Sequence, residues 1–305
     1  MSGLSLRGPR TIAESIGRTP LLRLCRVADG IPSEVEIWAK AEFLNPSGSV
    51  KDRAAWGIVQ TALREGRIGP RRTLVDASSG NTAVSFAMLG ASLGFPVRLF
   101  IPRNANPDRV ARVRAYGAGI VFTDPLEGTD GAQREARKFA EVNPDACFYA
   151  DQYNNPANPQ AHYESTGPEI WSQTTGRVTH FVSGVGTGGT VSGTGRYLKE
   201  RNSAIRVLGV EPDGPVHGLE GLKHLPTALR PGTYDAAVVD RTVRVRTEDA
   251  QQSTAMLARE EGLYVGPSSG AAVFASLEVA RTMSVGVVVT VLPDRGDRLT
   301  GEGGR

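Results

Sequence analysis

The sequence predicts an α/β protein with two domains, each a mostly parallel, twisted sheet flanked by helices. Near-continuous apolar runs alternate with helical patterns along most of the 305 residues. Strands that are buried on both faces read as such runs, and crossover helices cover both faces of a parallel sheet. The chain is also long enough for about two domains of ~150 residues each.

The individual elements follow from this alternation. Apolar, β-rich runs predict strands at 35–40, 73–78, 97–102, 119–123, 179–184, 205–212 and 285–294. Helical patterns lie at 81–93, 107–117, 129–142, 188–201, 248–262 and 269–282. Another helix is expected near Lys51, because Pro46 and Gly48 mark a turn and Ser49 is a suitable N-cap.

The segment 151–168 interrupts the alternation, because it is rich in proline and asparagine. We therefore place the domain change there. The expected division is an N-terminal segment, 1–45, packed on the large domain, a small and partly mobile domain, 46–151, and the large domain itself, 152–305. The stretch 211–235 is long for a connection, and such loops are usually functional or mobile.

Composition excludes several classes of protein. The chain is 40% hydrophobic and 22% charged, which is typical of a folded domain. Its net charge is +3, but the basic residues are scattered without interleaved aromatics, so we expect no nucleic-acid partner. No apolar run reaches the ~18 residues of a membrane span, and the N-terminus shows no signal-peptide pattern, so a cytoplasmic location is expected.

Cysteines and histidines give no sign of a metal site or a disulfide. Cys25 and Cys147 are expected to be reduced structural residues, since no CxxC spacing is present. The four histidines lack clustered or HExxH spacing, so no metal is expected. Lysine is more informative, because only 5 of the 35 basic residues are lysines.

Three strand-to-helix junctions combine small and polar residues. They are DASSGNT (76–82), SGVGTGGT (183–190) and VGPSSGAA (265–272). Ligands of open α/β sheets bind beyond the carboxyl ends of the strands, where helix N-termini favour anions. Single residues would suffice as N-caps, Ser79 or Asn81 in the first junction and Ser268 or Ser269 in the third. The surplus of hydroxyls in the first favours a carboxylate or phosphate site.

Two lysines compete for a chemical role. Lys51 is expected in the first turn of a helix, where the helix dipole and a dry pocket would both lower its pKa. A neutral amine suits Schiff-base chemistry and proton abstraction. The alternative is an exposed lysine paired with Asp52 or Glu42, and the local sequence leaves both open. Lys40 is expected to snorkel at a strand end.

The glycines of 181–195 also allow two interpretations. Gly184, Gly186 and Gly189 fit the G-x-G-x-x-G pattern of a dinucleotide site, and Glu211 follows at the offset of a ribose-binding acid. Against this, Thr187 and Thr190 add hydroxyls that suit one terminal phosphate. This pattern alone does not decide between them.

Taken together, these stretches resemble the cysteine synthase and cystathionine β-synthase family. The matching pieces are IGRTPLLRL, NPSGSVKDRAA, SSGNTA, DQYNNPANPQAHYESTGPEIW, GVGTGGT, GPSSGAA and LPDRGDR, in the family's order and across almost the whole chain. The resemblance implies a pyridoxal 5'-phosphate enzyme of fold type II, the tryptophan-synthase-β type. It also implies a homodimer whose small domain closes over the substrate.

The resemblance assigns roles to particular residues. Lys51 would form the Schiff base with pyridoxal phosphate and later move the α-proton. Asn81 would bind the ring hydroxyl, and Ser268 would face the ring nitrogen. The phosphate would lie on Gly186, Thr187, Gly188, Gly189 and Thr190. The substrate carboxylate would be held by Ser78, Ser79, Thr82 and Gln152. Glu211 is then expected at the edge of the substrate loop.

The implied reaction is β-replacement on an activated L-serine, O-acetylserine or O-phosphoserine, with sulfide or another sulfur donor to give L-cysteine. Serine acetyltransferase or a sulfur-carrier protein are the partners it suggests. The cations Lys223, His224, Arg295 and Arg298 motivate the hypothesis of a phosphorylated donor. Alternatives are condensation of serine with homocysteine, a serine or threonine dehydratase and, remotely, an NAD-dependent oxidoreductase.

Overall fold

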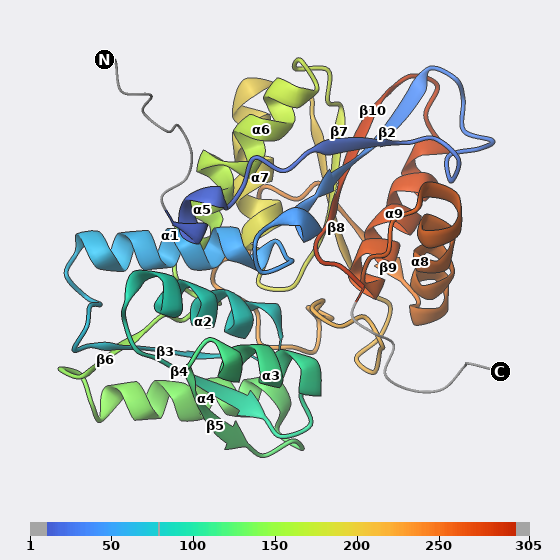
Figure 1. The fold of residues 1–305 in the computed structure, drawn as a ribbon. Helices are drawn as coiled ribbons and strands as arrows, with labels where there is room; N and C mark the ends of the chain where they lie inside the picture. The colour runs from blue at the N-terminus through green and yellow to red at the C-terminus, as the bar shows by residue number, and fades with distance from the viewer. Residues whose placement is uncertain (1–10, 79, 297–305) are drawn as a thin grey trace, which may run out of the picture.

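The polypeptide folds around two separate sheets (Figure 1). The structure is a computed structural model, and it describes residues 11–78 and 80–296. One sheet has six strands in the order β1-β2-β10-β7-β8-β9, and the other has four in the order β5-β4-β3-β6. Nine of the ten strands pair in parallel with a neighbour and β1 is antiparallel to β2, so the predicted fold class is confirmed.

The four-stranded sheet is formed by the middle of the chain. Its strands are β3 (Thr73–Ala77), β4 (Val97–Pro102), β5 (Gly119–Thr123) and β6 (Cys147–Tyr149). The helices around it are α1 (Lys51–Arg64), α2 (Asn81–Leu93), α3 (Pro107–Ala115) and α4 (Gly128–Glu141). The first three of these helices share one apolar cluster with the sheet, and α4 packs on the opposite face. Both faces are therefore covered, as the continuous apolar strands require.

The six-stranded sheet combines the two ends of the described chain. Its strands are β1 (Leu21–Leu24), β2 (Val35–Ala41), β7 (His180–Gly184), β8 (Arg206–Pro212), β9 (Arg241–Val245) and β10 (Gly286–Leu292). Helices α5 (Ala157–Glu164), α6 (Thr166–Gln173) and α7 (Gly189–Arg201) lie on one side, while α8 (Thr247–Glu261) and α9 (Pro267–Ala280) lie on the other (Figure 1). Two short 3-10 helices, η1 (Ile12–Ser15) and η2 (Glu42–Leu44), complete the fold.

The structure adds elements that the sequence did not predict. β1, β6 and β9 are short, and β9 lies at an edge of its sheet, so their patterns are weak. The expectation of an irregular segment at 151–168 is wrong, because α5 and the start of α6 lie within it. Contacts with α7 and α1 support these helices despite their proline and asparagine content.

The position of the two sheets bears on the domain division. The strands of the smaller sheet lie between residues 73 and 149, and β1 and β2 join the larger sheet. The exact boundaries at 45 and 151 stay a prediction. The long stretch between β8 and β9 contains no helix or strand from 213 to 240. Within the described ranges, no helix is long and apolar enough to cross a membrane.

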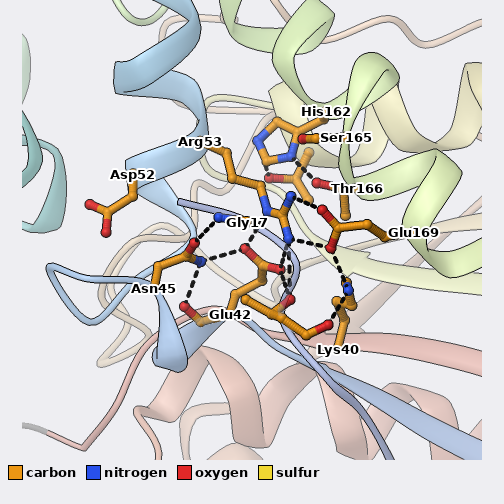
Figure 2. Close-up of polar contacts among 12 residues, drawn as sticks. Gly17, Lys40, Glu42, Asn45, Asp52, Arg53, His162, Ser165, Thr166 and Glu169 are labelled. Atoms are coloured by element: carbon orange, nitrogen blue, oxygen red, sulfur yellow. Dashed lines mark hydrogen bonds and ion pairs between the residues drawn. The ribbon is translucent and has the colours of Figure 1, made fainter. Parts of the chain in front are cut away.

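A network of charged side chains is buried where α1, β2, η2 and α6 meet (Figure 2). Arg53 contacts Glu42 through Nε at 2.7 Å and Glu169 through Nη1 at 2.7 Å. The side chains of Arg53 and Glu42 are both fully buried. Burial opposes ionisation of the arginine, but Glu42 and Glu169 raise its pKa above the usual value.

Lys40 belongs to the same network, so the expectation that it snorkels to solvent is wrong. Its side chain is 0% exposed, and its Nζ lies 2.6 Å from Glu169. The reason is the position of β2, which lies between β1 and β10 rather than at an edge. Burial lowers the pKa of Lys40, and the neighbouring Glu169 acts in the opposite direction.

Candidate active site

The polar junctions meet at a cavity of about 220 Å³ at the carboxyl ends of β3, β7 and β10. Among the predicted site residues, those lining the cavity are Lys51, Ser78, Asn81, Thr82, Gln152, Gly186 and Thr187. A smaller adjoining pocket is lined by Gly188, Thr190 and Ser268, together with Lys51 and Asn81. Of the remaining predicted residues, Gly189 is the first residue of α7, and Ser79 lies outside the described residues.

Lys51 is the first residue of α1, and its backbone is fixed to the large sheet. The preceding Val50 donates its N–H to the carbonyl of Pro293 at 2.7 Å. Val50 rather than Ser49 is the N-cap, so that prediction is wrong; the Ser49 hydroxyl still accepts from the Lys51 N–H at 3.3 Å. These contacts hold the start of the helix beside the end of β10.

The environment of the Lys51 side chain favours the neutral amine. Burial is the main cause of its lowered pKa, Asp294 opposes this effect, and Arg109 adds to it. Asp52 is engaged elsewhere, since it accepts the Ser47 N–H at 2.7 Å and the Ser85 hydroxyl at 2.6 Å. Glu42 binds Arg53. Neither Asp52 nor Glu42 is therefore the partner of Lys51 that the alternative of an exposed, ion-paired lysine required.

The turn after β7 has the shape of a small anion site. A Cβ added to Gly186 would lie 2.2 Å from the carbonyl oxygen of Gly221, and one added to Gly189 would lie 2.0 Å from Asn158 Oδ1. Side chains are therefore excluded at these two positions. Gly188 has φ +87°, in the left-handed region that favours glycine. With the N-terminus of α7 and two threonine hydroxyls, the turn fits a single phosphate.

Glu211, the candidate ribose ligand, has other partners. It is 3% exposed and accepts the backbone N–H of Leu225 at 3.3 Å. Arg244 Nε lies 3.3 Å from the other carboxylate oxygen. Glu211 therefore anchors the stretch 211–235 at the end of β8.

Polar side chains on the opposite wall of the cavity are hydrogen-bonded to one another. The Thr82 hydroxyl donates to Gln152 Oε1 at 2.7 Å. Gln152 Nε2 donates to the carbonyl of Ala77 at 3.0 Å and to Asp76 Oδ2 at 3.2 Å. Asn81 Nδ2 donates to Asp294 Oδ2 at 2.8 Å. These side chains place both donors and acceptors beside Lys51.

The helix caps at two junctions differ from the predictions. α2 is capped by Gly80 rather than by Asn81, and α9 by Gly266 rather than by Ser268 or Ser269, while Ser79 lies outside the described residues. Neither glycine offers a side chain, and neither helix has a side-chain hydrogen bond at its N-cap among the residues that the structure describes. Ser268 lies in the first turn of α9 and lines the smaller pocket.

Further residues at the cavity were not predicted as site residues, and they include Arg109, Tyr153, Glu220 and Asp294. The Arg109 Nη1 atom is paired with Glu220 Oε1. Asp294 ends a predicted strand, and Glu220 lies in the long loop, so their positions in the sequence could have identified them as site residues. Arg109 follows a helix start without special features, so nothing in its sequence position indicated a role at the site.

The cations considered for a phosphorylated donor are dispersed. Lys223 lines the cavity, where its Nζ lies 3.3 Å from Asp130 and 5.0 Å from the ring centroid of Tyr153. His224 Nδ1 contacts the Thr227 hydroxyl at 2.8 Å. Arg295 donates to the carbonyl of Phe43 at 3.4 Å and packs on Gly48. Arg298 lies outside the described residues.

Asp76, beneath Gln152, is expected to make stability depend on pH. It is 1% exposed, and burial raises its pKa to about 8, with the charge of Asp151 adding to the shift. In the unfolded chain this carboxyl is protonated only below pH ~4. The favourable contribution of Asp76 to the free energy of unfolding is therefore fully present below that pH and is lost as pH rises to about 8. Asp76→Asn should remove that loss while keeping an acceptor for Gln152.

Urea unfolding of the parent and the Asp76→Asn variant between those pH values tests this. The free-energy difference between the two proteins should change in favour of the variant as pH rises. A constant difference across the range would contradict the assignment.

The fold and the site together define an α/β enzyme that binds a phosphorylated ligand next to a desolvated lysine. The family model described as pyridoxal-phosphate dependent enzyme matches residues 12–294. The chain is 49% identical over 293 residues to a cysteine synthase of Aquifex aeolicus, which covers 94% of this chain and 90% of the relative. The chain therefore belongs to the family of pyridoxal-phosphate dependent enzymes.

Solved structures agree with this assignment. A crystal structure of cysteine synthase (OASS) from Entamoeba histolytica has a TM-score of 0.90 and 32% identity, covering 99% of this chain and 96% of its own. An O-acetylserine dependent cystathionine beta-synthase from Helicobacter pylori has a TM-score of 0.90 and 34% identity, covering 98% and 99%. The predicted family and its cofactor are confirmed, and the dinucleotide interpretation of the glycine turn is wrong.

Proposed function

We propose that the protein makes L-cysteine by β-replacement, with O-acetyl-L-serine as the amino-acid donor and sulfide as the nucleophile. The observation that carries the proposal is that a desolvated lysine, an anion turn and a wall of hydroxyl and amide groups share one cavity. The relative from Aquifex aeolicus is named a cysteine synthase, and the neighbour from Entamoeba histolytica carries the abbreviation OASS.

The residues around the two pockets suggest how pyridoxal phosphate would be held. Gly186, Thr187, Gly188, Gly189 and Thr190 would hold the phosphate, Asn81 the ring hydroxyl, and Ser268 would lie by the ring nitrogen. When bound, the cofactor withdraws electrons from the α-carbon of the amino acid and so permits loss of the β-substituent. A neutral serine does not keep the ring nitrogen protonated, and this favours prompt elimination over a long-lived carbanion.

Lys51 moves the proton in this proposal. Its amine is held close to the ligand by the first turn of α1, and burial favours its neutral form. The amine takes the α-proton as the acetate leaves and returns a proton to the same carbon after sulfur has added. Asp294, which opposes the pKa shift, lies near enough to stabilise the charged state between these two events.

The opposite wall would bind the substrate carboxylate. Ser78, Ser79, Thr82 and Gln152 are the proposed ligands, and Asp76 orients the amide of Gln152 from below. Carboxylate binding would exchange some of the hydrogen bonds within this wall for bonds to the substrate. The smaller sheet carries most of these groups, so its movement would close the cavity and exclude water.

The charges at the cavity favour the acetylated donor. Arg109 is paired with Glu220 and Lys223 is paired with Asp130, so each of these cations at the cavity already has an acidic partner. A phosphate at the β-position would have to displace Asp130 and lie near Glu220. We expect kcat/KM to be higher for O-acetylserine than for O-phosphoserine, and Lys223→Ala to leave this order unchanged.

Cysteine formation from each donor with sulfide, in parallel assays of the parent and Lys223→Ala, tests this expectation. Faster turnover of O-phosphoserine that is lost in the variant would contradict it. Free serine serves as the third donor, because its use would indicate a different leaving-group requirement.

A second candidate reaction uses homocysteine as the nucleophile. The similarity to the Helicobacter pylori enzyme, whose name specifies both O-acetylserine and cystathionine, favours its inclusion. Adding sulfide and homocysteine separately to the enzyme with O-acetylserine distinguishes the two. Pyruvate formation without either nucleophile would instead indicate a dehydratase.

We also propose a cytoplasmic homodimer, with serine acetyltransferase or a sulfur-carrier protein as its partner. The homodimer and the partners rest on the family resemblance. The location is supported by the two cysteines, which are both unbridged. Sedimentation velocity of the purified protein tests the dimer, since a monomer at micromolar concentration would contradict it.

A further inference from the structure

His162 of α5 connects the buried charge network to the phosphate turn. It is 1% exposed, its Nδ1 lies 2.9 Å from the Thr166 hydroxyl, and its Nε2 lies 3.2 Å from the Thr190 hydroxyl. Figure 2 shows the imidazole beside Arg53 and Thr166. Neither catalysis by Lys51 nor substrate binding uses this side chain, so its burial calls for another explanation.

The imidazole is neutral. Burial lowers its pKa to about 3, and Arg53 is the strongest charge acting in the same direction, followed by Lys51. Glu42 and Glu169 oppose the shift but are themselves bound to Arg53. A neutral ring carries one N–H, so it donates from one nitrogen and accepts at the other.

The Thr166 hydroxyl decides which nitrogen carries the proton. Thr166 is 0% exposed, and His162 Nδ1 is the hydrogen-bond partner that its hydroxyl has among the described residues. If Nδ1 donated to Thr166, the threonine O–H would be buried without an acceptor, which is costly. Thr166 therefore donates to Nδ1, and the ring proton lies on Nε2.

Among the described residues, the hydrogen-bond partner of Nε2 is the Thr190 hydroxyl, whose oxygen can accept from an Nε2–H group. When that oxygen accepts from His162, the hydrogen of the Thr190 hydroxyl is free to point elsewhere. Thr190 lines the smaller pocket next to Gly186 and Thr187. In the opposite tautomer, the Thr190 hydroxyl would donate its hydrogen to the unprotonated Nε2. The oxygen lone pairs of Thr190 would then face the anion.

We propose that His162, held as the Nε2–H tautomer, is a positioning residue that makes Thr190 a hydrogen-bond donor to the cofactor phosphate. The inference rests on the placement of pyridoxal phosphate proposed above. It explains why a histidine is buried against the charge network. Arg53 favours the neutral ring, Thr166 fixes the nitrogen that carries the proton, and the hydroxyl of Thr190 is thereby left to donate to the phosphate.

Histidine ¹⁵N NMR of the holoenzyme tests the tautomer directly. We expect one ring to show a protonated Nε2 and an unprotonated Nδ1, unchanged from pH about 6 to about 9. Loss of these signals in His162→Gln assigns them among the four histidines. A protonated Nδ1, or a ring that titrates in this range, would overturn the inference.

Release of the cofactor, followed by loss of its visible absorbance, tests the consequence. His162→Leu should release it on the order of tenfold faster than the parent. His162→Gln, whose amide can still donate to Thr190, should recover most of this loss. Equal release by the two variants would overturn the inference.

Thr190→Val provides the matched background. If His162 acts through the Thr190 hydroxyl, then His162→Leu and His162→Gln should release the cofactor at the same rate in the Thr190→Val protein. A full tenfold difference in that background would overturn the inference. A parent protein that binds no pyridoxal phosphate would contradict the proposed function, whereas a normal cofactor complex with the wrong tautomer would contradict this inference alone.

Discussion

Replacing Lys51 with alanine is expected to lower kcat for cysteine formation by about 10²–10⁴-fold, and to remove the covalent link to the cofactor. The loss would follow from the position of Lys51, which starts α1 next to the anion turn and has an amine whose pKa is lowered by burial. Steady-state assays with O-acetylserine and sulfide, together with the visible spectrum of the purified variant, measure both effects.

Lys199→Ala is the matched control for this substitution. Lys199 pairs with Asp240 at 2.7 Å on a partly exposed surface, so its loss should leave activity and spectrum unchanged. Parent-like turnover by Lys51→Ala would contradict the assignment. A large loss in Lys199→Ala would show that the assay responds to changes outside the site.

Replacing Arg53 with methionine is expected to reduce the free energy of unfolding by about 3–5 kcal/mol. Methionine fills similar space, but it leaves Glu42 fully buried without its partner and removes the contact of Glu169. The effect is large because removing one partner of a buried pair leaves an uncompensated charge in a site that water does not reach. Urea unfolding monitored by circular dichroism measures it.

Arg177→Met tests whether burial is the cause. Arg177 binds Glu36 at a similar distance, 2.9 Å, but its side chain is 53% exposed. Solvent screens this pair, so its removal should change stability little. If both variants lost the same free energy of unfolding, burial could not be the reason why the Arg53 ion pairs stabilise the fold.

Much of the architecture could be predicted from hydrophobic pattern. Strands such as β4 and β10 are apolar on both faces and alternate with helical patterns, so their type and order could be read directly. α5 could not, because Asn158 and Pro159 disfavour a helix, and contacts with α7 stabilise it instead. Tertiary contact outweighed local preference there.

The residues of the candidate site also fall into those that the sequence could predict and those that it could not. Lys51 and the glycine turn lie beside strand ends, which is where ligands of α/β proteins bind, and the family resemblance then decided between the interpretations that position left open. Lys40 also ends a strand, but that strand is interior, and no local pattern reports that Glu169 of α6 lies against it. Arg109 reaches the cavity only through the packing of α3. The surroundings of His162 combine α5 with the neighbouring α6 and α7 and with Arg53 of the more distant α1, and no local pattern reports this arrangement.

The central claim is that pyridoxal phosphate is bound through Lys51 in the cavity between the sheets. Borohydride reduction of the holoenzyme, followed by peptide mass mapping, tests it most directly because reduction fixes the cofactor to the lysine that holds it. The account predicts a single modified peptide in which Lys51 carries the cofactor. Modification of Lys40 or Lys223 in its place, or an unmodified chain, would contradict it.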